Sequence, residues 1–175
     1  SARECLTFTK MNDRIEMQHN SDLPAMSGLG SSSAFTVGFL NALYTLQGKT
    51  TVPKIQLASD AIYVEQQLLK ENVGSQDQVA AAFGGLNKIG GPEKIRISPV
   101  GLAPATIKAL EDHLMLFFTG FSRNASGIAA EQIRNTKAKS KELQAMGAMV
   151  PEAMKILNAG PSRLNDFAKL LDESW

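Results

Sequence analysis

A glycine- and serine-rich segment lies directly ahead of the most apolar stretch of this 175-residue chain. The segment reads Pro-Ala-Met-Ser-Gly-Leu-Gly-Ser-Ser-Ser over residues 24–33, and the apolar stretch runs from Ala34 to Leu46. Glycines allow tight turns in which successive N–H groups point inward, and a helix N-terminus adds partial positive charge. The pattern predicts a phosphate-binding loop at the start of a largely buried helix.

The residues of the loop leave two interpretations open. A Walker loop would need Gly-x-x-x-x-Gly-Lys followed by Ser or Thr, and no such string occurs in the sequence. Without that lysine, the charge of a bound nucleotide would have to be met by Mg²⁺ and the helix N-terminus. Alternatively, the segment is a flexible linker in which Ser31 or Ser32 caps the helix.

A carboxylate falls on the apolar stripe of the second predicted helix, which starts near Pro53 and is expected to reach about Leu69. The apolar residues of the stripe recur at helical spacing: Ile55, Ala58, Ile62 and Leu69. Glu65 lies on the same face. A buried carboxylate needs a cation, a hydrogen-bonding network or a water-filled cleft, so Glu65 is a candidate metal ligand. In the alternative interpretation, Glu65 sits at the edge of the stripe and reaches solvent or pairs with a lysine.

A second polar loop, Gly74–Gln78, opens a short alanine-rich helix that Gly84 and Gly85 are expected to end. Asp77 lies in the first turn of this helix. As a structural residue it would complement the helix dipole behind a Ser75 cap. As a functional residue it would accept a hydroxyl proton during phosphoryl transfer.

Composition and charge exclude several classes of protein. The formal net charge is +1, from 18 basic and 17 acidic residues, so no global field would attract nucleic acid. Cys5 is the only cysteine, which excludes an intrachain disulfide and favours a reducing compartment. Residues 34–46 are too short and too often interrupted by polar residues to span a bilayer, and no signal peptide is visible. We therefore expect a cytoplasmic protein without nucleic-acid or membrane partners.

The remaining patterns predict alternating helices and strands around one domain boundary. Strands are expected at 5–10 and 14–19 as a hairpin, and at 86–89, 94–99 and 114–119. Beyond a short helix that follows the boundary at Gly101–Pro104, helices are expected at about 125–145, 150–158 and 162–172.

Taken together, these segments resemble the GHMP kinases, a family named for galacto-, homoserine, mevalonate and phosphomevalonate kinases. The family's phosphate loop, Pro-x-x-x-Gly-Leu-Gly-Ser-Ser followed by a small residue, matches residues 24–33 at every fixed position. In this family, a glutamate on the following helix and a loop serine ligate Mg²⁺, and an aspartate about a dozen residues later is the proposed base. Glu65 and Asp77 are 77 − 65 = 12 residues apart.

The resemblance implies a role for each of these residues. The ATP-binding loop would comprise Pro24, Gly28, Leu29, Gly30, Ser31, Ser32 and Ser33, with the backbone amides of 28–33 around the phosphates. Ser32, or its neighbour Ser31, would ligate Mg²⁺ together with Glu65. Asp77 would orient or deprotonate the hydroxyl of the acceptor.

Two further segments are similar to the heptose 7-phosphate kinase and fucokinase-like branch of the family. One is Gly74–Gln78 with the following Ala80–Asn87, and the other is Phe118–Ala125 followed by Glu131-Gln132. The branch implies a sugar or sugar-phosphate acceptor, with the anomeric hydroxyl of a heptose 7-phosphate as first choice. Arg123 would then bind an anionic group of substrate or nucleotide, or else it is an ordinary surface arginine.

The resemblance also implies an α+β fold in two parts. Residues 1–103 would be part of an N-terminal ATP-binding domain like ribosomal protein S5 domain 2, and residues 104–175 part of a ferredoxin-like C-terminal domain. The chain matches only the middle of the family's pattern, so we expect a fragment that lacks both ends. Sheet edges left unpaired would then promote homo-oligomers or domain swapping.

Two other functions remain open at this stage. One is a non-catalytic nucleotide- or sugar-binding module on the same scaffold. The other is a GHMP-type kinase or decarboxylase that acts on another small metabolite, such as fucose, galactose or a mevalonate-type precursor.

Overall fold

The apolar stretch after the glycine-serine loop forms the longest helix of the first half of the computed structural model. The structure describes residues 1–22, 28–91, 95–117 and 125–174. Their contacts divide the chain into two units, one made of residues 1–97 with 118–131, and the other of residues 98–117 with 132–175. The predicted division into family domains at residue 103 stays a prediction.

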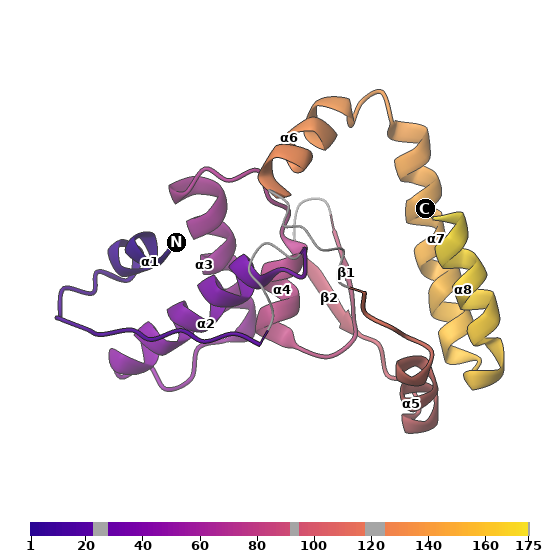
Figure 1. Ribbon diagram of the computed structural model, residues 1–175, viewed down its shortest axis with the longest axis horizontal. Coiled ribbons are helices and arrows are strands. Elements are labelled where there is room, and N and C mark those ends of the chain that lie inside the picture. The colour runs from indigo at the N-terminus through magenta and orange to yellow at the C-terminus, as the bar shows by residue number, and fades with distance from the viewer. Residues whose placement is uncertain (23–27, 92–94, 118–124, 175) are drawn as a thin grey trace. The chain divides into compact units, whose positions relative to one another are not determined.

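Helix α2 (Ser31–Leu46) is central to the first unit, where it packs against α1 (Ala2–Thr9), α3 (Lys54–Tyr63) and α4 (Gln76–Phe83) (Figure 1). Its core face repeats at helical spacing through the following buried residues: Val37, Leu40, Leu43 and Tyr44. Cys5 of α1 and Leu57 and Ala61 of α3 belong to the same hydrophobic cluster. The predicted helix is confirmed, and it begins three residues earlier than expected.

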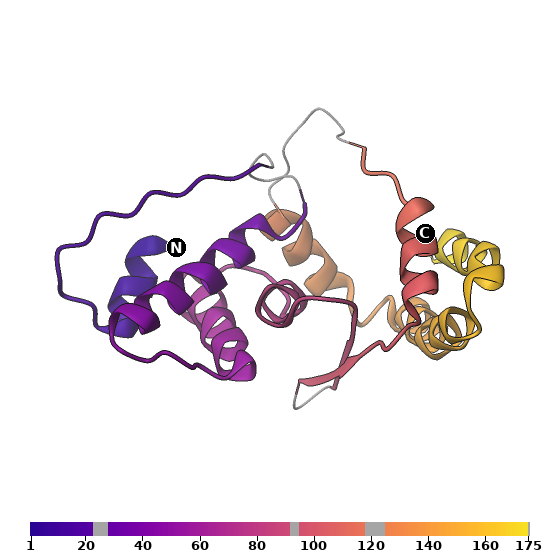
Figure 2. The same cartoon turned by 90° about the horizontal axis from the view of Figure 1, so that it is seen from below.

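The predicted hairpin at residues 5–19 is wrong. Residues 2–9 form α1, in which Cys5 and Thr9 are buried one helical turn apart and Thr9 Oγ1 donates to the Cys5 carbonyl at 2.8 Å. Lys10 ends the helix with φ 55°. Residues 11–22 then run as extended chain without a strand assignment (Figure 2). The apolar pattern of Cys5–Thr9 fits both the alternation of a strand and the period of a helix. Packing against α2 favours the helix.

The core face of α3 is rotated from the predicted stripe. Leu57, Ala58 and Ala61 are buried, whereas Ile55 is 42% exposed. The helix begins after Pro53 as predicted and continues as a π-helical turn, η1 (Val64–Leu68). Of the four apolar residues of the predicted stripe, only Ala58 is fully buried, because Ile62 and Leu69 are half-buried.

A two-stranded sheet follows α4. Gly84 and Gly85, with φ 66° and 71°, end the helix, and strands β1 (Asn87–Gly90) and β2 (Arg96–Pro99) pair with each other. Both strands were expected from the sequence, within about two residues. The described residues are thus mainly helical with one small sheet, and the S5-like and ferredoxin-like assignments stay predictions.

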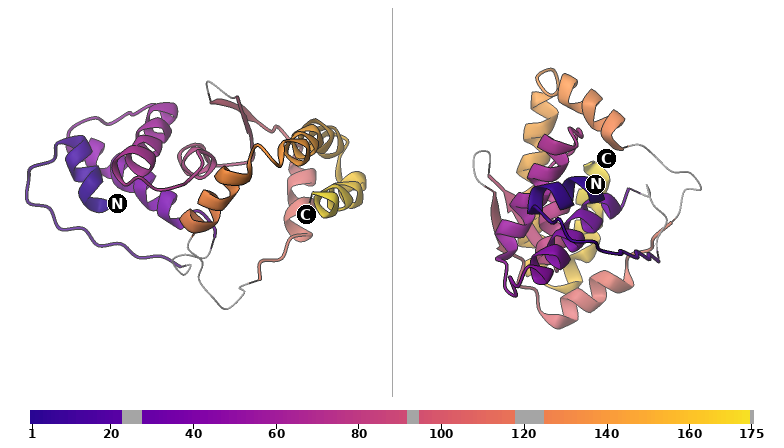
Figure 3. Two further views of the ribbon diagram at one scale, coloured as in Figure 1. Left: turned by 90° about the horizontal axis from the view of Figure 1, so that it is seen from above. Right: turned by 90° about the vertical axis from the view of Figure 1, so that its left-hand side faces the viewer.

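The second unit is built from helices. Helix α7 (Ser140–Asn158) packs beside α8 (Leu164–Glu173), and α5 (Pro104–Asp112) contacts the short 3₁₀ turn η2 (Pro161–Arg163) between them (Figure 3). Helix α6 (Ala125–Asn135) lies across the division between the units.

Two predictions for this half of the chain are wrong. Helix α6 ends at Asn135 and α7 runs from Ser140 through Pro151 to Asn158, although helices were expected at about 125–145 and 150–158. Residues 114–117 carry no strand, and their apolar side chains are 61–78% exposed. Within the described ranges, no helix is long and apolar enough to cross a membrane.

Candidate active site

The loop at the start of α2 supplies backbone N–H groups at a helix N-terminus. Gly28 and Gly30 have φ 79° and 71°, a left-handed conformation that other residues adopt only with strain. Gly30 is the N-cap, and its carbonyl accepts the Ala34 N–H at 2.9 Å. In the part of the chain that the structure describes, no side chain caps this helix. The interpretation of Ser31 or Ser32 as a capping residue is therefore wrong. Pro24, the first residue of the predicted ATP-binding loop, lies outside the described residues.

Glu65 lies in the π-helical turn and is fully buried. Its Oε2 accepts a hydrogen bond from Ser33 Oγ at 2.9 Å and a second from Gln78 Nε2. Ser33 belongs to the first turn of α2 and Gln78 to the first turn of α4. The alternative in which Glu65 reaches solvent or pairs with a lysine is wrong.

The second oxygen of the Glu65 carboxylate, Oε1, differs from Oε2 in its hydrogen bonding. Oε1 is buried and makes no hydrogen bond with any described residue. Leaving a buried polar atom unpaired costs about 1–3 kcal/mol, and more when the group is charged. A cation at this oxygen would offset that cost, so the local chemistry fits a metal ligand.

Asp77 lies beside Gly30 of the phosphate-loop candidate. A Cβ atom added to Gly30 would lie 3.2 Å from Asp77 Cγ and 3.4 Å from its Oδ2. The aspartate is exposed, whereas the neighbouring Gln78 is buried. Ser75 precedes the helix but makes no side-chain capping hydrogen bond. The first turn of α4 therefore directs one side chain to the loop and the next to Glu65.

Three segments that are distant in sequence thus meet at one place. Gly30, at the start of α2, lies beside Asp77, and Ser33 in the first turn of α2 donates to Glu65. Gln78, next to Asp77 in α4, donates to the same carboxylate oxygen of Glu65. Ser32, predicted as a metal ligand, is exposed, and it is Ser33 that contacts Glu65. The roles of all these residues stay predictions. Arg123, the predicted anion-binding residue, lies outside the described residues.

Sequence reasoning missed Gln78. The signal that could have found it is the one that identified Glu65, a polar residue on an apolar helical stripe. Gln78 and Val79 are both fully buried, and Ala82 one turn later packs against the hydrophobic cluster. A buried amide on such a face requires a hydrogen-bonding partner, which here is Glu65.

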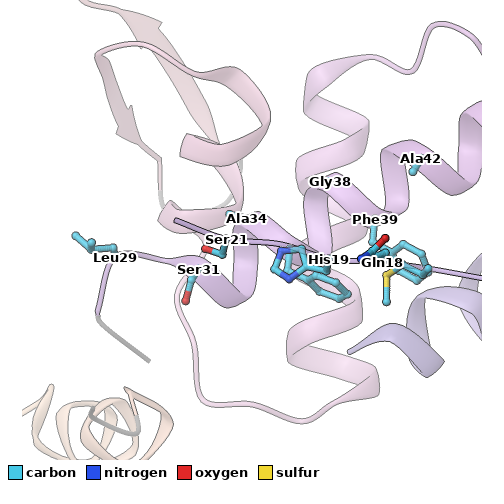
Figure 4. A pocket seen from close by; sticks show the side chains of 11 residues that line it. Gln18, His19, Ser21, Leu29, Ser31, Ala34, Gly38, Phe39 and Ala42 are labelled. Carbon is cyan, nitrogen blue, oxygen red and sulfur yellow. The ribbon is translucent and has the colours of Figure 1, made fainter. Parts of the chain in front are cut away.

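A groove of about 480 Å³ begins at the loop and follows α2. Leu29 and Ser31 line the end nearest the loop, and Phe35 and Phe39 line the helix side. His19, from the extended segment, meets the Phe35 ring edge to face with 5.1 Å between centroids. Figure 4 shows His19 and Phe39 along the groove and Ser31 and Leu29 toward the loop. The walls are mainly apolar and aromatic, which is typical of ligand-binding clefts.

Within the described ranges, no group of three His, Cys, Asp or Glu residues could hold a metal ion. Glu65 with a neighbouring serine is a smaller donor set. That set still fits Mg²⁺, which usually binds through one or two carboxylates plus substrate phosphates and keeps several waters. A metal at this site would therefore depend on a bound nucleotide for part of its coordination.

The contact between Gly30 and Asp77 predicts the effect of Gly30→Ala. The added methyl would force a left-handed alanine and press against Asp77. We expect the variant to lose about 1–2 kcal/mol of stability through backbone strain. For the phosphoryl transfer that the family resemblance implies, we also expect about a tenfold loss, because small displacements of a reacting group are costly. Chemical denaturation and steady-state kinetics measure the two effects.

Gly48→Ala is the matched control, because Gly48 has φ 80° and no atom within 4 Å of the added Cβ. It should lose similar stability and keep its activity. Equal activity losses in the two variants would contradict a role for the contact between Gly30 and Asp77.

Comparison with known proteins identifies the family of the first unit. Residues 2–85 match the sequence model described as GHMP kinases N terminal domain. The chain is 30% identical over 171 residues to the D-glycero-alpha-D-manno-heptose 7-phosphate kinase of Campylobacter jejuni subsp. jejuni serotype O:2, covering 96% of this chain and 50% of that protein. It is 27% identical over 173 residues to the L-fucokinase/L-fucose-1-P guanylyltransferase of Bacteroides fragilis, covering 92% of this chain and 17% of that protein.

The chain therefore spans half or less of the length of these curated relatives. No solved structure matches it significantly. The family match covers the loop, Glu65 and Asp77, which are the features from which the resemblance was inferred. Residues 2–85 are thus a GHMP kinase N-terminal domain, and the family inferred from the sequence is confirmed.

Proposed function

We propose that this chain carries the nucleotide-binding part of a kinase that transfers the γ-phosphoryl group of Mg-ATP to a hydroxyl of a sugar or sugar phosphate. The observation that carries the proposal is the meeting of the glycine loop with Glu65 and Asp77. Asp77 occupies the space that a Cβ on Gly30 would meet, with its Cγ 3.2 Å from that position, and Ser33 donates to Glu65 at 2.9 Å. A phosphate-binding helix start, a metal-ligand candidate and a base candidate therefore surround one position.

Each part of the site has a separate task in this proposal. The N–H groups of residues 28–33 bind the triphosphate, since they stand at the start of α2 and are not capped by a described side chain. The apolar groove beyond Ser31 accepts the nucleoside. Asp77, exposed beside the loop, accepts the proton of the acceptor hydroxyl or orients that hydroxyl for attack.

Mg²⁺ would be held by Glu65 together with a loop serine, Ser32 or Ser33. When bound, the ion neutralises negative charge on the nucleotide phosphates. The protein's own contribution is to hold the carboxylates of Glu65 and Asp77 in place. Ser33 and Gln78 fix one oxygen of Glu65, and Gly30 leaves room for the carboxylate of Asp77.

The anomeric hydroxyl of a heptose 7-phosphate is our first choice of acceptor. Two observations support it, namely the match of Gly74–Asn87 to that branch and the similarity of almost the whole chain to a relative named as a heptose 7-phosphate kinase. Fucose is the second candidate, because a relative named as an L-fucokinase is also similar over most of the chain.

An acceptor panel tests the proposal. The protein is incubated with Mg²⁺, ATP and one acceptor at a time, namely heptose 7-phosphate, fucose, galactose or mevalonate, and product is followed by ³¹P NMR. We expect a glycosyl phosphate signal with heptose 7-phosphate, at a kcat/KM at least about tenfold above any other acceptor, a preference of about 1.4 kcal/mol.

Other results would redirect the assignment. Transfer to fucose or mevalonate alone would retain the kinase and replace the acceptor. Nucleotide binding without transfer to any acceptor, by a protein in which both flanking segments of the family pattern are present, would contradict the proposal and favour the non-catalytic binding module.

A further inference from the structure

The two oxygens of the Glu65 carboxylate are held unequally. Oε2 accepts from Ser33 Oγ at 2.9 Å and from Gln78 Nε2, whereas Oε1 has no partner among the described residues. The two donors come from different helices, α2 and α4, and both are buried. Two donors on one oxygen restrict rotation of the carboxylate and leave the other oxygen for a further ligand.

Packing alone does not explain Gln78. Its side chain is fully buried, its neighbour Val79 is apolar, and its own Oε1 also lacks a partner among the described residues. A leucine or methionine would fill similar space without an unsatisfied carbonyl oxygen. The amide N–H, donated to Glu65, is the property that a hydrophobic residue could not supply.

The local backbone strengthens this connection. Glu65 lies in a π-helical turn closed by the Leu69 N–H to the Val64 carbonyl at 2.9 Å. Such turns are rare in proteins as a whole, and those that occur are often found at functional sites. Gln78 follows Asp77 in the chain, so one turn of α4 contacts both Glu65 and the loop.

We propose that Gln78 is a positioning residue that holds the Glu65 carboxylate in the orientation that binds the divalent cation. This inference rests on the proposed function, because it assumes that Glu65 is a ligand of the cation. Gln78 itself does not touch the reacting groups.

The test replaces the amide with a side chain of similar shape that cannot donate, Gln78→Met. Mn²⁺ serves as the probe, and its binding to the protein with a non-hydrolysable ATP analogue is measured by electron paramagnetic resonance. We expect the Kd for Mn²⁺ to rise about 10- to 100-fold, the usual loss when a group supporting a metal ligand is removed. Transfer at saturating Mg²⁺ should fall much less than transfer at low Mg²⁺.

Gln76→Met is the matched control, because Gln76 is exposed and lies two residues earlier on the same helix. It should bind Mn²⁺ as the wild type does. A merely structural role for Gln78 would lower the melting temperature of Gln78→Met and leave the Kd for Mn²⁺ unchanged, which would overturn the inference. If Gln78→Met does not fold, Gln78→Leu removes the same donor with a side chain of similar size, and wild-type Mn²⁺ binding by that variant would overturn the inference equally.

Failure of the inference and failure of the proposed function give different results. If Gln78→Met transfers phosphate at the wild-type rate and its Kd for Mn²⁺ is unchanged, only the positioning role of Gln78 is refuted. In the other case, the wild type transfers phosphate to no acceptor, but Gln78→Met binds Mn²⁺ and nucleotide more weakly than the wild type does. That result refutes the kinase and supports the positioning role of Gln78.

Discussion

Asp77→Asn is expected to lower kcat for phosphoryl transfer by about 10²- to 10⁴-fold, the usual contribution of a positioned general base. The substitution removes the charge and the proton-accepting oxygen, but the amide has the same size. It therefore keeps its place beside Gly30 and leaves the candidate phosphate loop intact. Steady-state ADP release measures kcat, and calorimetry measures the Kd for ATP, which should change little.

The size of this loss also separates two roles for the aspartate. Phosphoryl transfer proceeds through a loose transition state in most analyses, so a residue that only orients the hydroxyl gives a loss near the lower end of the range. Asp13→Asn is the control, because Asp13 is an exposed aspartate in the extended segment after α1. Wild-type turnover by Asp77→Asn would show that Asp77 is neither base nor positioning group.

Glu65→Gln is expected to reduce kcat/KM at low Mg²⁺ by at least about 100-fold, because removing one partner of a buried charge pair costs about 3–5 kcal/mol. The fold should remain, since the amide oxygen of glutamine still accepts from Ser33 and Gln78. Without metal, the variant should melt at the wild-type temperature or above it, because a buried negative charge has been removed. Kinetics over a series of Mg²⁺ concentrations and thermal melting measure these effects.

Glu65→Leu distinguishes charge from hydrogen bonding at the same position. Leucine leaves the buried donors of Ser33 and Gln78 unpaired, at about 1–3 kcal/mol each, so this variant should melt well below Glu65→Gln. Unchanged dependence on Mg²⁺ in Glu65→Gln would remove Glu65 from the set of metal ligands.

Local patterns were sufficient to predict most helices and to select Glu65 and Asp77 as candidates, whose roles stay predictions. The α2 helix, the end of α4 at Gly84 and the strands near residues 87 and 96 follow from periodicity and from glycine positions. The segment Cys5–Thr9 failed because five residues fit a helical or an alternating pattern equally well, and contact with α2 decided between them. The prediction of a strand at 114–119 is wrong over residues 114–117. These residues are apolar, but they neither pair with a strand nor are buried.

The sequence by itself determined the phosphate-loop pattern, the choice of Glu65 as a candidate polar residue on the second helix and the twelve-residue spacing to Asp77, because each depends on a short stretch of chain. Only the tertiary structure decided that Ser33, rather than Ser32, contacts Glu65, that Gln78 donates to the same oxygen and that Gly30 lies against Asp77. These contacts join residues 32, 13 and 47 positions apart, counted as 65 − 33, 78 − 65 and 77 − 30. Their geometry depends on how α2, α4 and the π-helical turn pack together, and no local pattern contains that information.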